Sequence, residues 1–177
     1  AHGYRASTFE IPTGYMIQTY YKGPLVLHML RMLLLFRTGS DVVFVKSMRD
    51  FLAEHDGASA GTEDFRRVLE RNAGGEDFGW FFDSWIYRAA VPSYSWRYAV
   101  KAEGDGQLLT VELTRRDVGD DFVAVIPLRV ELEGGKAEML FIRNETNRQT
   151  FTHRFPAKVK NVVLGPDSSL LAYIKRN

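Results

Sequence analysis

The chain has 177 residues, of which 45% are hydrophobic and 25% are charged, with a net charge of +1. This composition is typical of a globular protein with one ordinary domain or two small ones, and it excludes a disordered or fibrous chain. The near-balance of charge indicates no nucleic-acid partner, because such a partner requires a concentrated basic face. The chain contains no cysteine, which excludes disulfides and thiolate metal sites but leaves the cellular compartment open.

The apolar runs are too short for a membrane span. The longest of them, Leu25 to Phe36, is interrupted by His28 and Arg31 and falls short of the ~20 residues that a membrane helix needs. We therefore expect no membrane segment. The first residue is Ala1 rather than methionine, which favours a piece of a longer protein.

The first half of the sequence has helical periodicity. A short strand at Phe9 to Ile11 has no obvious place. From Tyr20 to about Arg37, apolar residues recur at positions i, i+3, i+4 and i+7, which predicts a buried helix that ends at Gly39. Ser40 and Asp41 offer an N-cap for a second helix that ends near residues 55–57. Its inward side chains are expected to be Val42, Phe44, Val45, Met48, Phe51 and Leu52.

Two further helices are expected before Pro92. Thr62 is expected to cap the third helix, Glu63 to Asn72, which ends at a pair of glycines. The fourth begins at Asp77, and its aromatic residues Phe78, Phe81, Phe82 and Trp85 form one broad stripe. Short helices joined by short loops predict an antiparallel helical array of about four helices.

After Pro92 the pattern changes to alternation, which is typical of strands with one buried face. Gly-, Asn- and Asp-rich turns separate seven such segments, and this spacing predicts a β-sandwich. The segments are centred on Trp96 to Val100, Leu109 to Leu113, Val123 to Glu133, Ala137 to Arg143, Gln149 to Phe155, Val159 to Leu164 and Leu171 to Lys175.

The expected fold class is therefore α+β, with helices at residues 1–92 followed by a seven-stranded sandwich at residues 93–177. Each part has about 85 residues, a size at which an isolated domain buries only ~60–65% of its unfolded surface. We expect the two parts to pack against each other, or against a further domain, through the aromatic residues around Trp80 and Trp85.

The sequence contains no recognisable motif for a metal site or for a catalytic serine. The four histidines form no H-E-x-x-H pair, so no metal or cofactor site is predicted within this chain. His28 is interpreted as a core or interface histidine and His55 as a helix-end residue. Asp117, Asp120 and Asp121 lack the spacing of a calcium loop and indicate a plain turn instead. No G-x-S-x-G elbow is present.

The segment Tyr20-Tyr21-Lys22-Gly23 is the candidate for chemistry. A phenol is a neutral hydrogen-bond donor at physiological pH. Such a donor can stabilise an oxyanion, and removing one oxyanion donor typically costs ~10²–10³ in rate. From the residues alone, a tyrosine that opens an apolar helix is an ordinary core or rim residue.

The segment resembles the Tyr-x-Lys-Gly motif of the aminopeptidase N family of zinc metallopeptidases (gluzincins). The same family's later elements are similar to Met29-Leu30-Arg31, Phe82-Asp83-Ser84-Trp85 and Val91-Pro92. The resemblance implies that Tyr20 stabilises the tetrahedral intermediate and that a catalytic domain passes into a β-sandwich near Pro92. The zinc motif itself is missing, so zinc, its ligands and the general-base Glu are expected upstream in a parent protein. The implied partners are that upstream catalytic domain and a peptide substrate.

Two functions are therefore considered. In the first, the chain is the C-terminal part of a zinc aminopeptidase that hydrolyses N-terminal peptide bonds, and it is inactive alone. In the second, it is a non-catalytic interaction module of a parent that has lost its zinc ligands. The aromatic residues Trp80, Trp85, Tyr87 and Trp96 would then form a contact surface, unless they fill the space between helices and sandwich.

Overall fold

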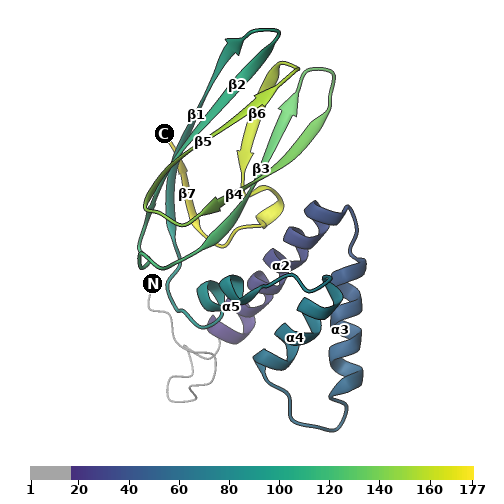
Figure 1. The fold of residues 1–177 in the computed structure, drawn as a ribbon. Helices are drawn as coiled ribbons and strands as arrows, with labels where there is room; N and C mark the ends of the chain where they lie inside the picture. The colour runs from purple at the N-terminus through teal and green to yellow at the C-terminus, as the bar shows by residue number, and fades with distance from the viewer. Residues whose placement is uncertain (1–16) are drawn as a thin grey trace.

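The computed structural model describes residues 17–177, in which helices precede two β-sheets (Figure 1). The short strand expected at residues 9–11 lies outside the described residues. The helical part consists of a π-helical turn, η1 (Ile17–Lys22), followed by four α-helices. These are α2 (Gly23–Thr38), α3 (Val42–Glu54), α4 (Thr62–Asn72) and α5 (Gly79–Trp85).

Helix α2 has more buried residues than any other described helix. Pro24 stands in its first turn, where the missing N–H costs nothing, and Gly39 ends it in the left-handed conformation at φ 71°. Its buried face is formed by Val26, Met29, Leu30, Met32, Leu33 and Leu34. The helix predicted from Tyr20 therefore exists, but Tyr20 itself belongs to the π-helical turn before it.

The predicted inward face of α3 is wrong in part. Val42 and Leu52 are each 66% exposed and Val45 is also exposed, whereas Ser47 is fully buried. The Ser47 hydroxyl donates to the carbonyl of Val43 at 2.8 Å, which satisfies this polar group inside the core. Phe44 packs against the core as predicted, and so does Val43, which was not predicted to face inward. The helix carries more apolar residues than its core-facing side can hold.

The remaining helices follow the sequence prediction closely. Gly61 rather than Thr62 is the N-cap of α4, because the Asp64 carboxylate accepts the Gly61 N–H at 2.8 Å. Val68 and Leu69 of α4 are buried as expected. Helix α5 begins at Gly79, and the predicted aromatic stripe is confirmed: Phe78, Phe81, Phe82 and Trp85 are all at most 2% exposed.

The seven predicted strands are confirmed. They are β1 (Ser93–Glu103), β2 (Gly106–Arg116), β3 (Ala124–Leu132), β4 (Ala137–Asn144), β5 (Arg148–Phe155), β6 (Val159–Leu164) and β7 (Tyr173–Arg176). One sheet has the order β5-β2-β1-β7 and the other β4-β3-β6. All pairs are antiparallel except β1 with β7. The inward side chains of both sheets belong to one core, as in a β-sandwich.

The same core continues into the helices. Trp85 of α5 packs edge-to-face on Phe122, with ring centroids 5.0 Å apart, and the Ser84 hydroxyl accepts the Val123 N–H at 3.0 Å. On the other side, His28 of α2 donates to the carbonyl of Asp167 at 2.8 Å. Helices and sandwich thus pack against each other, as expected. Their division into two domains between residues 92 and 93 stays a prediction.

A buried tyrosine at the start of the sandwich predicts a pH dependence of stability. Tyr94 is 1% exposed, and its hydroxyl donates to Asn144 Oδ1 at 3.2 Å. Burial raises the pKa of Tyr94 above the ordinary value of ~10, because the phenolate would lose its hydration. The folded-state pKa thus exceeds the unfolded one. Tyr94 then contributes stability that is fully present below about pH 10 and is lost as the pH rises through the folded pKa.

We expect the denaturant midpoint of the chain to fall above about pH 10, and to fall less in Tyr94→Phe. Tyr173→Phe is the matched control, since Tyr173 is 64% exposed and has little burial to lose. Equal pH profiles for the chain and for Tyr94→Phe would contradict this assignment.

Candidate functional site

Tyr20 stands on the surface in the π-helical turn η1, just before α2 begins at Gly23. Tyr20 is 59% exposed and its neighbour Tyr21 is 65% exposed. A π-helix is rare in proteins, and short π segments occur frequently at functional sites. The structure therefore presents the candidate phenol outward, in a local geometry that the sequence pattern did not predict.

Lys22 ends the same turn but points into the structure. Its Nζ donates to the main-chain carbonyl of Arg88 at 2.5 Å, across 66 positions of sequence. The side chain is half-buried, and this burial lowers the pKa of Lys22 because the ammonium loses hydration. The contact joins the Tyr20 turn to the loop between α5 and β1, and the sequence analysis missed it.

The loop that receives Lys22 is itself held from both sides. The Arg88 guanidinium binds the Asp121 carboxylate through two hydrogen bonds of 2.5 Å, which raises the pKa of Arg88 and lowers that of Asp121. Next to it, the Tyr87 hydroxyl donates to the Glu63 carboxylate of α4. Loss of hydration, and then this bond, raise the pKa of Tyr87 to about 12. The loop thus connects η1, α4 and the turn between β2 and β3.

The four aromatic residues predicted to form the contact surface of an interaction module are not all exposed. Trp85 and Trp96 are buried, and Trp80 is half-buried with the guanidinium of Arg143 5.8 Å from its ring. Only Tyr87 of the four is exposed. The exposed apolar residues of the helices lie mainly on α3 and on the first turns of α2, which the sequence analysis treated as core.

No candidate metal site exists in the part of the chain that the structure describes: residues 17–177 contain no group of three His, Asp or Glu side chains arranged to hold an ion. His28 and His55 each bond a main-chain carbonyl, as their structural interpretation predicts. Asp117 adopts a left-handed turn conformation, at φ 68°. Asp120 accepts a bond of 2.7 Å from Asn147. The residues that the structure describes therefore offer a zinc ion no set of ligands.

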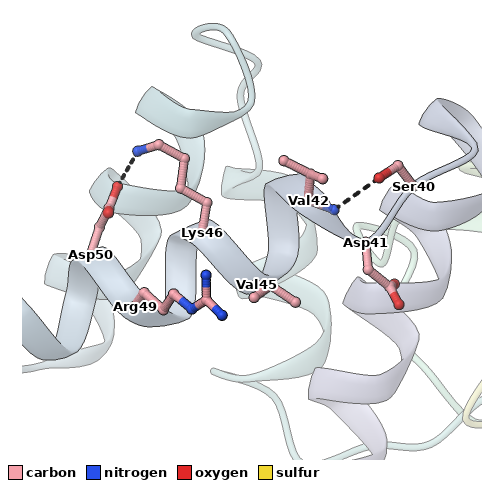
Figure 2. A pocket seen from close by; sticks show the side chains of 7 residues that line it. All are labelled: Ser40, Asp41, Val42, Val45, Lys46, Arg49 and Asp50. Atoms are coloured by element: carbon pink, nitrogen blue, oxygen red, sulfur yellow. Dashed lines mark hydrogen bonds and ion pairs between the residues drawn. The ribbon is translucent and has the colours of Figure 1, made fainter.

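A shallow hollow on the surface of α3 contains none of the residues of the Tyr20 turn. Figure 2 shows the side chains that line it: Ser40, Asp41, Val42, Val45, Lys46, Arg49 and Asp50. Three of its charged groups already have partners, since Lys46 binds Asp50 and Asp41 accepts a bond of 2.5 Å from Arg31. The hollow is formed by polar side chains and by the exposed valines of α3.

None of the described helices is long and apolar enough to cross a lipid bilayer. The sequence matches no described protein family and no curated protein.

The fold is similar to that of a solved peptidase, Legionella pneumophila aminopeptidase A, whose crystal structure contains aspartic acid. The match has a TM-score of 0.69 at 15% identity and covers 93% of this chain. It covers 18% of the Legionella chain, so this chain spans less than a fifth of the structure it matches. At this identity the likeness shows the fold alone.

Proposed function

We propose that the chain is the C-terminal part of a zinc aminopeptidase of the aminopeptidase N type, in which Tyr20 donates a hydrogen bond to the reacting carbonyl. The observation that carries this proposal is the exposed Tyr20 in a π-helical turn of the Tyr-x-Lys-Gly segment, in a chain whose fold is similar to that of an aminopeptidase. Tyr20 lies on the surface of this chain, where a substrate bound by another part of the protein could contact it.

The role of this chain is to place a donor where charge develops. When water attacks the carbonyl carbon of a peptide bond, negative charge builds on the carbonyl oxygen. A preorganised hydroxyl that faces this oxygen stabilises the transition state more than the ground state, and so it accelerates the reaction. Zinc held by residues of the parent would activate the water. The described residues supply no group of side chains that could hold a metal, so the chain alone is expected to be inactive.

The proposal is tested on the reading frame that contains this chain. We expect an H-E-x-x-H motif and a later helical Glu upstream of Ala1, bound zinc in the full-length protein, and hydrolysis of aminoacyl anilides. The 177-residue chain measured in parallel should bind no zinc and hydrolyse nothing. A full-length protein with these ligands replaced and with no hydrolysis would favour the interaction module instead.

A further inference from the structure

The π-helical turn that contains Tyr20 makes a long-range polar contact through Lys22. Lys22 is two residues after Tyr20 in the same π-helical turn, and its Nζ lies 2.5 Å from the carbonyl oxygen of Arg88. Residues two positions apart do not share a helix face. When Lys22 is held toward the interior, Tyr20 therefore points toward the surface, and it is exposed in the structure.

The environment of Lys22 is unusual for a lysine. Lysine side chains normally keep the ammonium in water, because it is strongly hydrated. Here the ammonium is half-buried, and its partner is a neutral carbonyl; Lys22 forms no ion pair with any carboxylate in residues 17–177. An exposed ion pair would hold the turn loosely, whereas a desolvated donor on a main-chain acceptor fixes one geometry.

The acceptor lies in a loop that has further contacts of its own. The carbonyl of Arg88 belongs to a residue whose guanidinium is bound twice by Asp121. The preceding residue, Tyr87, donates its main-chain N–H to Phe82 at 3.0 Å, and its side chain binds Glu63. The chain of contacts therefore runs from the sandwich turn at Asp121, through Arg88, to Lys22 and the Tyr20 turn.

We propose that Lys22 is a positioning residue, whose bond to the Arg88 carbonyl orients the Tyr20 hydroxyl toward the reacting carbonyl oxygen. This inference rests on the proposed function. The sandwich then also contributes to the reaction, because Asp121 binds the side chain of Arg88 and the Arg88 carbonyl accepts the bond from Lys22. A misplacement of about 1 Å in a reacting group can cost ~10²-fold in rate, so losing this bond is expected to affect turnover strongly.

The test is a double-mutant cycle in the full-length protein, with Tyr20→Phe, Lys22→Met and the double variant. Lys22→Met keeps an unbranched apolar stem and removes the donor. We expect it to lower kcat by ~10–10²-fold with little change in KM. In the Tyr20→Phe background the same change should have almost no further effect, because there is no hydroxyl left to orient. Lys22→Arg, which keeps a charged donor, should recover part of the loss.

Equal factors for Lys22→Met in both backgrounds, or no loss of kcat at all, would overturn the role of Lys22. Near-normal turnover of Tyr20→Phe would instead overturn the proposed function, so the two failures are distinguishable. Zinc content and thermal unfolding of each variant show whether it is folded. If Lys22→Met does not fold, Lys22→Arg gives the same coupling measurement, and a loss that is additive with Tyr20→Phe overturns the proposal.

Discussion

Replacing Tyr20 with phenylalanine in the full-length protein is expected to lower kcat by ~10²–10³-fold while zinc content stays unchanged. The change removes one hydroxyl from a side chain that is 59% exposed in this chain, so no core packing is lost. The loss should appear in kcat and in kcat/KM alike, because the bond is made to an oxygen that is charged only in the transition state. Steady-state hydrolysis of an aminoacyl anilide measures both parameters.

Tyr21→Phe is the matched control. Tyr21 lies in the same π-helical turn and is as exposed as Tyr20, at 65%. The family resemblance places it at the variable position of the motif, so its hydroxyl should be dispensable. A mild effect in both variants, or an equal loss in both, would contradict the assignment of Tyr20.

The second large effect concerns stability. Trp85→Ala is expected to destabilise the chain by ~3–5 kcal/mol, the usual cost of removing a buried large aromatic side chain. Trp85 is 2% exposed and packs edge-to-face on Phe122, so it fills the junction between α5 and the sandwich. Because the core continues from helices to strands, helical and sheet signals should be lost in one transition. Denaturant unfolding followed by circular dichroism and by tryptophan fluorescence measures this.

Leu52→Ala is the matched control for that loss. Leu52 lies on the exposed side of α3, at 66% exposure, so its truncation should change stability by no more than ~0.5 kcal/mol. Two separate transitions, with Trp85→Ala affecting only the helical one, would show that residues 1–92 and 93–177 unfold independently. An unchanged midpoint for Trp85→Ala would contradict the role of the aromatic junction.

Much of the fold could be predicted from the sequence because its signals are local. Alternation and Gly- or Asn-containing turns located all seven strands, and the aromatic stripe of α5 located the junction with the sandwich. The face of α3 could not be predicted in the same way. Val42, Val45 and Leu52 have the right spacing for a core, and a buried serine that satisfies itself on Val43 has no sequence signal.

The order of the strands could not be predicted from the sequence for a different reason. Which strands pair is decided by contacts between distant segments: β2 pairs with β5, and β7 adds in parallel to β1 at the end of the chain. The periodicity of each strand is the same whichever partner it takes. The sequence therefore predicts the sandwich but not the order of its strands.

The candidate site shows the same limit. The motif picks out Tyr20, but it does not reveal the π-helical turn or the acceptor of Lys22. That acceptor is a main-chain carbonyl 66 residues away, and a carbonyl carries no residue-type signal. The Arg88–Asp121 pair that holds this loop appears in the sequence as two ordinary surface charges. The contacts of Lys22 and Arg88 form only when the chain is folded.

The central claim is tested most directly by a crystal structure of the full-length protein with a phosphinic peptide, whose tetrahedral group imitates the attacked carbonyl. The quantity to measure is the distance from the Tyr20 Oη to the phosphinyl oxygen. We expect ~2.5–3.0 Å, the length of an O–H···O hydrogen bond, with Lys22 Nζ still on the Arg88 carbonyl. A Tyr20 hydroxyl directed away from the inhibitor, with another donor on that oxygen, would contradict the account.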